Sequence, residues 1–270
     1  MPDRLVDTYD HARFVSAAEA PVRTITPSPQ AYLETPDVNE PTVIRDYFGD
    51  DAHSPQAFLV ERLPAYRTVR AHFHPVDQFQ IFFPAPGVWY KRGPIQDVTV
   101  HYADAFVTYG PFGSKEMPMS FFTLRSEATG QTSYMPDSIH DLPRIVPRGR
   151  NVEAHVRVPS GPGLRGSHKD ELIPPAKDGL SAYVLNLGPE LPVETSVSSR
   201  SVGQYYYVLA GSVTTSGREY ADRSLGWRPP DLGFSGDVVS GPDGCSVLVM
   251  QFPSSHERIV SARPRASLRT

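Results

Sequence analysis

Polar and apolar residues alternate most regularly in residues 78–83, which read QFQIFF. Successive side chains of a β-strand point to opposite faces, so Gln78 and Gln80 would share one face while Phe79 and Ile81 share the other. The apolar face suits the core of a sandwich, and the glutamine face would look toward a polar region. We find no convincing amphipathic helix, so the pattern predicts an all-β fold. Further strands are expected at residues 57–61, 66–70, 96–102 and 121–125.

A second block of strands, between residues 180 and 252, echoes the first. Its centre at residues 204–211, QYYYVLAG, resembles the run that begins at Gln78 and lies 126 positions later. A repeat at this distance is typical of one β-unit followed by a second copy of itself. The same offset places Ser198 and Arg200 where the first copy has His72 and His74, so the second copy lacks that histidine pair.

Composition divides the rest of the chain. Residues 1–50 are polar and interrupted by prolines, which predicts an arm that covers a sheet edge or wraps a neighbouring subunit, and a homodimer is one expected assembly. Residues 51–126 and 180–253 are the two strand-rich units. Residues 127–179 predict a proline-rich linker, and residues 254–270 predict an arginine-rich tail.

Charge and cysteine content narrow the expected partners. The 270 residues carry a net charge of −4 with a pI near 6.1, which gives no electrostatic reason to expect nucleic acid or an anionic membrane as a partner. The single cysteine, Cys245, cannot form an intrachain disulfide and favours a reducing compartment. The N-terminal residues contain no apolar signal segment, so a cytoplasmic protein is expected. The expected partner is a small-molecule substrate.

The candidate chemistry begins with two histidines one strand step apart. His72 and His74 would project from the same face of a strand, and an oxygen ligand from the next strand could join them. Two imidazoles on a rigid face suit a divalent transition metal. The alternative is that they are ordinary histidines on a solvated strand.

This segment resembles the first motif of the cupins, in which a glycine is followed by HxH, a glutamate and a closing glycine. Here His72 and His74 match the histidines, Gln78 stands at the glutamate position, and Gly87 lies near the closing glycine, while the leading glycine is missing. With the repeat, the chain resembles a bicupin. The resemblance implies two tandem double-stranded β-helix (jelly-roll) barrels, with metal ligands in the first barrel only.

The resemblance implies four ligands, of which His72 and His74 are the firmest. The third is Gln78, which has the family spacing, or Asp77, which has the charge but whose strand parity aims it at the opposite face. The second cupin motif usually supplies a fourth histidine, and none lies at that spacing in this chain. His101, 23 residues after Gln78, is the candidate, or else a polar pocket residue beside the metal.

Three residues are predicted to serve catalysis, namely Arg70, Gln80 and Tyr102. An arginine beside a metal favours a carboxylate or enolate substrate, bound through two hydrogen bonds. Asp104, Tyr109 and Arg125 are further candidates for the pocket mouth.

The predicted function is a metal-dependent enzyme that acts on a small organic acid or aromatic compound. Fe(II) and dioxygenase chemistry are the first choice, with Zn, Mn, Ni or Cu as alternatives. A Zn-type isomerase, cyclase or lyase remains an alternative function. A non-enzymatic small-molecule-binding cupin is another.

Overall fold

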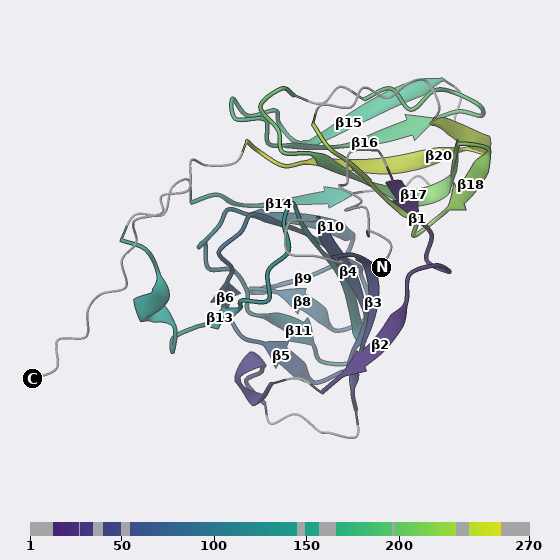
Figure 1. The fold of residues 1–270 in the computed structure, drawn as a ribbon. Helices are drawn as coiled ribbons and strands as arrows, with labels where there is room; N and C mark the ends of the chain where they lie inside the picture. The colour runs from purple at the N-terminus through teal and green to yellow at the C-terminus, as the bar shows by residue number, and fades with distance from the viewer. Residues whose placement is uncertain are drawn as a thin grey trace, which may run out of the picture.

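Nearly all regular structure in the chain is β-strand (Figure 1). The computed structural model describes residues 13–26, 28–34, 40–49, 55–144, 149–156, 166–195, 198–230 and 238–254. Within these residues the only helices are two single turns of 3-10 helix, Pro29–Ala31 and Ile139–Asp141. The predicted all-β fold is therefore confirmed. No helix of the described residues is long and apolar enough to cross a membrane.

The first barrel contains most of the strands. They are β2 (Val22–Ile25), β3 (Thr42–Phe48), β4 (Gln56–Leu63), β5 (Arg67–Val69), β6 (His72–Phe73), β7 (Gln78–Phe82), β8 (Val88–Tyr90), β9 (Gly93–Pro94), β10 (Val98–Ala103), β11 (Phe112–Ser114), β12 (Met119–Arg125), β13 (Ser133–Tyr134) and β14 (Asn151–Val156). One sheet has the order β14-β10-β7-β12-β4-β3-β2, and a second has the order β5-β11-β8-β9. A ribbon of β6 and β13 carries the histidines at one end. Apolar side chains from both sheets, such as Phe82 and Phe112, fill the space between them.

The second copy forms one seven-stranded sheet in the described residues. Its strands are β1 (Arg13–Val15), β15 (Ser167–Ile173), β16 (Ser181–Leu187), β17 (Gln204–Thr215), β18 (Arg218–Ala221), β19 (Leu225–Arg228) and β20 (Val239–Gln251). Their order is β1-β19-β17-β20-β16-β15, and β18 pairs with β17. This order matches β14-β10-β7-β12-β4-β3 of the first barrel, strand for strand.

The repeat extends to the register of the central strands. Gln78 lies opposite Arg125 across β7 and β12, and Gln204 lies opposite Gln251 across β17 and β20. Both members of the second pair are 126 positions beyond their counterparts. The 126-residue offset read from the alternation is therefore the offset of the structural repeat.

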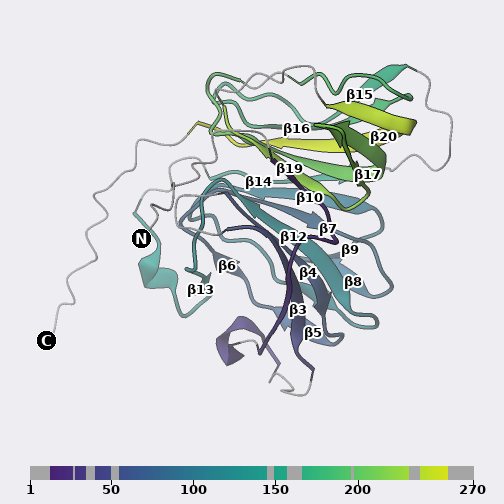
Figure 2. The same ribbon diagram turned by 45° about the vertical axis from the view of Figure 1, so that its right-hand side comes forward.

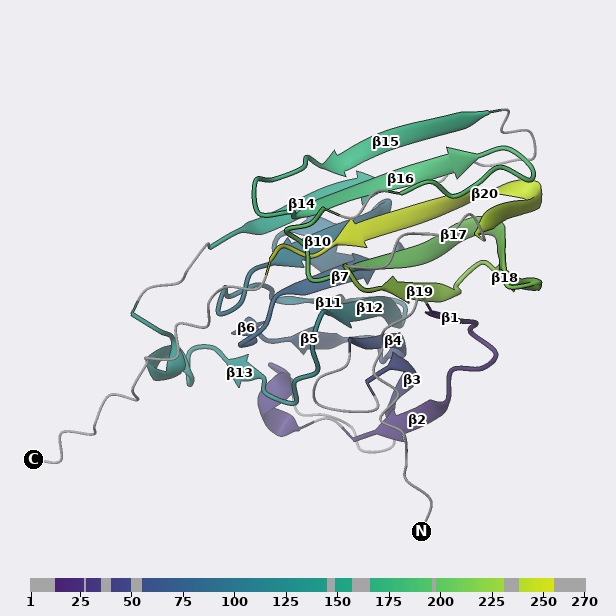
Figure 3. The ribbon, with the colours of Figure 1, turned by 45° about the horizontal axis from the view of Figure 1, so that its top comes forward.

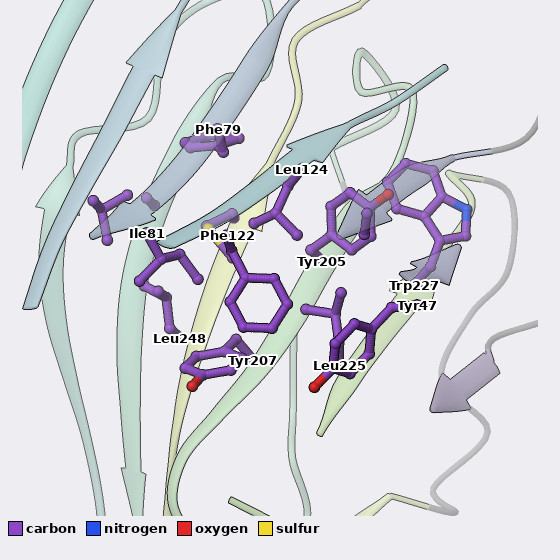
Figure 4. Close-up of a cluster of buried hydrophobic side chains, with 14 of the residues drawn as sticks. Tyr47, Phe79, Ile81, Phe122, Leu124, Tyr205, Tyr207, Leu225, Trp227 and Leu248 are labelled. Carbon is purple, nitrogen blue, oxygen red and sulfur yellow. The ribbon is translucent and has the colours of Figure 1, made fainter. Parts of the chain in front are cut away.

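The sheet of the second copy packs against the seven-stranded sheet of the first barrel (Figures 2 and 3). Phe79 and Phe122 from the first barrel meet Tyr205, Tyr207 and other apolar side chains of the second copy in one cluster (Figure 4). The ring centroids of Phe122 and Tyr207 are 5.1 Å apart. The apolar face predicted for residues 78–83 thus lies in a sandwich core, which is shared by the two copies.

The segments predicted as arm and linker supply strands to both sheets. β2 and β3 extend the first barrel, while β1 pairs with β19 of the second copy. β14 and β15 come from residues 127–179 and join different sheets. β15 reads SHKDELI and is exposed along most of its length, so backbone pairing with β16 makes it a strand although its side chains show no buried face. Residues 1–12 and 255–270 lie outside the described residues.

Candidate functional site in the first barrel

His72 lies in the ribbon at the end of the first barrel, on β6, and His74 follows directly after this strand. His72 exchanges two backbone hydrogen bonds with Tyr109, which hold the loop before β11 against β6. Both histidines are buried, each with 5% of its surface exposed, and their ring centroids are 5.2 Å apart. The structure therefore brings the two predicted imidazoles together.

Backbone carbonyls fix the orientation of both rings. Nδ1 of His72 lies 2.7 Å from the carbonyl oxygen of Arg70, and Nδ1 of His74 lies 2.6 Å from that of Gln131. A carbonyl only accepts, so each Nδ1 carries the proton and each neutral ring presents a lone pair at Nε2. Nε2 of His72 makes no hydrogen bond to any described residue.

Arg125 reaches the pair from the end of β12. Its Nη2 lies 3.0 Å from Nε2 of His74, and its Nε donates to Oε1 of Gln78 at 2.9 Å. Nη1 donates to Oε1 of Gln56 at 2.6 Å and to the carbonyl of Thr129 at 3.1 Å. These acceptors are all neutral, although the charged Arg125 is buried, with 5% of its surface exposed.

Gln78 and Tyr109 complete this cluster of buried side chains. The Gln78 amide donates to the hydroxyl of Tyr109 at 2.5 Å, and the Tyr109 ring lies 4.4 Å from that of His72. The predicted third ligand therefore faces the histidines, but its oxygen already accepts from Arg125. Asp77, the alternative ligand, accepts from the backbone N–H of Ala105 at 2.8 Å instead.

Burial sets the protonation states in this pocket. It lowers the pKa of His72 to about 4, against a smaller opposing effect of the Arg70 carbonyl. Burial, and next the charge of Arg125, lower the pKa of His74 well below its ordinary value. Burial also raises the pKa of Tyr109. At neutral pH the pocket thus holds neutral imidazoles, a protonated phenol and one cation.

His101 and Gln80 form a separate group deeper in the barrel. Nδ1 of His101 lies 3.1 Å from Oε1 of Gln80, and Nε2 lies 2.9 Å from the hydroxyl of Tyr90 and 3.1 Å from Oδ1 of Asn151. Burial lowers the pKa of His101 to about 3. Both ring nitrogens are engaged with other side chains, and none of these is His72 or His74. The centroid of the His101 ring lies 5.1 Å from that of Tyr109, which also packs against His72.

The remaining predicted residues are held elsewhere. Tyr102 lies on the opposite face of β10 from His101, in the core shared by the two copies, and its hydroxyl donates to Asp104 at 2.8 Å. Asp104 in turn binds Arg150. The Arg70 guanidinium donates to the Met135 carbonyl and contacts Asp137. This corrects the predicted set of residues: Tyr102, Asp104 and Arg70 lie outside the cluster around His72 and His74, and Arg125 supplies the arginine.

Two residues at the centre of the pocket, Tyr109 and Arg125, were expected only near its mouth. Neither shows a spacing signal in the sequence. Arg125 could have been placed only through the pairing of β12 with β7, which puts it opposite Gln78. Gln131 acts through its backbone, which no sequence pattern reveals.

These donors fit a divalent metal only in part. The Nε2 lone pairs of His72 and His74 suit one, but the third predicted donor, Gln78, is neutral and bonded to Arg125. Among the described residues, no three His, Cys, Asp or Glu side chains form a group that could hold a metal. The pocket as built therefore does not fit the four-ligand metal site that the motif implies.

No family model matches the chain, and no curated protein matches its sequence. Solved structures do match. A "putative dioxygenase" from Nostoc punctiforme is 11% identical, with a TM-score of 0.63 over 92% of this chain and 84% of that one. HEPD from Streptomyces albus, with 2-hydroxyethylphosphonate and Fe(II) bound, is 10% identical, with a TM-score of 0.53 over 94% and 78%. The chain has the cupin fold.

A variant of Bacillus subtilis oxalate decarboxylase also matches this chain, at 11% identity and a TM-score of 0.52 over 90% of this chain and 77% of that one. The cupin fold predicted from the histidine motif and the repeat is thereby confirmed. Identities of 10 to 11% establish the fold, while activity must be argued from this chain's own residues.

Proposed function

We propose that this cupin is an enzyme that binds a small organic acid in the first barrel, with Arg125 holding the acid's carboxylate. The observation that carries the proposal is a buried guanidinium whose acceptors are all neutral. A buried charge without a counter-ion is costly, and a carboxylate ligand would relieve that cost. Nε and Nη1 of Arg125 are bonded to Gln78, Gln56 and Thr129, so Nη2, which lies against the His74 ring, is the nitrogen that can turn an N–H toward a ligand.

The neighbouring groups can move a proton on such a ligand. Nε2 of His72 is free to accept one, and the lowered pKa keeps this ring neutral at pH 7. The Tyr109 hydroxyl, which accepts from Gln78, keeps its own proton to donate. A base and a donor beside a bound carboxylate support isomerase, cyclase or lyase chemistry.

Binding can be tested by isothermal titration with benzoate and malonate, using benzamide as the neutral match for benzoate. We expect the carboxylates to bind and benzamide to bind at least about 10-fold more weakly, because a hydrogen bond to a charged group contributes about 1.5–3 kcal/mol. Arg125→Gln should lose at least about 10-fold in carboxylate affinity for the same reason. Arg62→Gln, on an exposed position of β4, is the matched control and should bind as the parent does.

Equal affinity for benzoate and benzamide, or unchanged binding by Arg125→Gln, would contradict the proposal. Turnover is followed by proton NMR of the bound acids, and His72→Ala should bind but not convert them. Binding without conversion by the parent protein would favour the non-enzymatic alternative.

A metal-dependent dioxygenase is the second candidate. The orientation of both imidazoles favours it, since backbone carbonyls hold each Nδ1 and leave Nε2 for a metal. The structural similarity to the Nostoc protein and to the Fe(II)-bound HEPD also supports this candidate. Bound Fe(II) would supply oxygen activation, with His72 and His74 as its protein ligands. The metal content of the purified chain distinguishes this candidate from the first.

A further inference from the structure

The Arg125 guanidinium lies against two of the predicted metal ligands, His74 and Gln78. Its Nη2 lies 3.0 Å from Nε2 and 3.3 Å from Nδ1 of His74, so it packs against the face of that ring, and its Nε donates to Oε1 of Gln78 at 2.9 Å. These atoms belong to two of the ligands that the sequence motif assigns to the metal. A metal ion bound to both residues would lie beside the guanidinium, and the two positive charges would repel each other.

Arg125 is also anchored away from the histidines. Nη1 donates to Gln56 and to the carbonyl of Thr129, and the carbonyl of Arg125 itself accepts from the hydroxyl of Tyr205. Withdrawal of the guanidinium would break the first two of these bonds and leave Oε1 of Gln56 with only the backbone N–H of Thr129, at 3.4 Å. The side chain is therefore held at the histidines from both sides.

The charge of the pocket leads to the same conclusion. The residue that would supply a negative ligand is the neutral Gln78, and no carboxylate of the described residues forms an ion pair with Arg125. Asp77 and Asp104, the acids of the adjacent loop, bind Ala105 and Arg150 instead. A divalent ion beside Arg125 would place three positive charges in a buried pocket without a protein anion.

We infer that Arg125 replaces the divalent metal in this barrel, as a resident cation built into the chain. This inference rests on the proposed function, because it concerns the same group of residues. It refines that function, since the acid would be bound without a metal. The two histidines keep the geometry of metal ligands but serve the guanidinium and the substrate.

The test is the metal content of the full chain, purified without a histidine tag from cells supplied with iron, manganese and zinc. We expect less than about 0.2 of any metal per chain, because a divalent ion would lie beside a buried guanidinium with no protein anion to balance the charge. Gln78→Glu should stay as poor in metal as the parent, since the introduced carboxylate would pair with Arg125. From the sequence motif alone, the same substitution would be expected to raise metal affinity. The metal content of this variant therefore distinguishes a metal site from a site occupied by Arg125.

Removal of the guanidinium should open the site. Arg125→Leu should take up more metal than the parent, and the double variant Gln78→Glu/Arg125→Leu should approach one metal per chain. Addition of His74→Ala to the double variant should abolish the gain, which would locate the metal at this pocket. Arg62→Leu, the control on β4, should match the parent.

About one metal per chain in the parent, lost in His74→Ala, would overturn the inference, as would a metal-loaded Gln78→Glu. Both measurements stand even where Arg125→Leu fails to fold. The benzoate titration is separate: carboxylate binding by a metal-loaded parent would refute the inference and keep the proposed function. A metal-free parent that binds no carboxylate would do the reverse.

Discussion

His101 should make the folding stability of the chain depend on pH. Burial lowers its pKa to about 3 from an ordinary value near 6.5. Between these values the unfolded chain binds a proton that the folded chain does not, so stability falls as pH falls, by up to about 1.4 kcal/mol per pH unit. His72, with a pKa of about 4, acts in the same direction.

Urea unfolding at a series of pH values between about 7 and about 5 measures this slope. His101→Asn should reduce the slope by up to about 1.4 kcal/mol per pH unit, whatever its effect on stability at pH 7. A variant with the slope of the parent would show that His101 is not held neutral by burial.

Among single residues, the sequence located the histidine pair but not the partners of its side chains. Alternation correctly placed Phe79 and Ile81 in a core and Gln78 on the opposite face, and the resemblance to the cupin motif placed Gln78 beside the histidines. It could not show that Oε1 of Gln78 is bound to Arg125, because that bond depends on how β12 pairs with β7. The role of His101 as a metal ligand remains a prediction.

At the scale of elements, β11 depends on the absence of a side chain at Gly113. A Cβ built there would lie 2.0 Å from the carbonyl oxygen of Arg67 on β5, which is far inside van der Waals contact. β11 pairs with β5 on one side and β8 on the other, so it has no room to move away. Gly113→Ala should therefore destabilise the fold by about 1–3 kcal/mol, the usual cost of overpacking.

Gly93→Ala on β9 is the matched control, because no atom lies within 4 Å of the added Cβ. Its effect should stay within about 0.5 kcal/mol in the same urea titration. Equal effects of the two substitutions would mean that β5 and β11 separate freely.

The strands inside the two copies could be predicted, while those contributed by the flanking segments could not. The strands that begin at Gln78 and Gln204 carry a clear apolar pattern because their side chains are buried on both faces of the sheet. β15 and β2 are mostly exposed edge strands, so their sequences carry no periodic apolar signal. Proline content alone made residues 127–179 look like a linker, although β14 and β15 begin and end between its prolines.

For the whole molecule, Tyr205 connects the second copy to the pocket of the first. Its hydroxyl donates to the backbone carbonyl of Arg125 at 2.9 Å, and the residue is fully buried. Tyr205→Phe leaves that carbonyl without this donor, so it should destabilise the chain by about 1–3 kcal/mol and weaken benzoate binding.

Tyr207→Phe serves as the control, because Tyr207 lies in the same core and its hydroxyl makes no hydrogen bond to a described residue. It should leave stability and binding near those of the parent. If the two substitutions have the same effect in urea unfolding and titration, the contact from Tyr205 does not position Arg125.

The cupin fold and its duplication could be predicted because short stretches of sequence indicate both. The HxH motif indicates the fold, and the run that recurs at Gln204 indicates the duplication. The joint packing of the copies could not, because alternation shows that a face is apolar but not which sheet will cover it. Gln204 shows how far the copies have diverged: it is the counterpart of Gln78, yet it is buried with neither amide atom bonded.

The apolar layer between the copies has a consequence for how the protein behaves in solution. Phe122, Tyr207 and Leu248 form a contact of the kind that joins subunits, but here both halves belong to one chain. Dilution cannot separate them, since the effective concentration of one half near the other is fixed by the covalent connection. The molecule is in this sense a tethered dimer with unlike halves, and the geometry around Arg125 does not depend on how much protein is present.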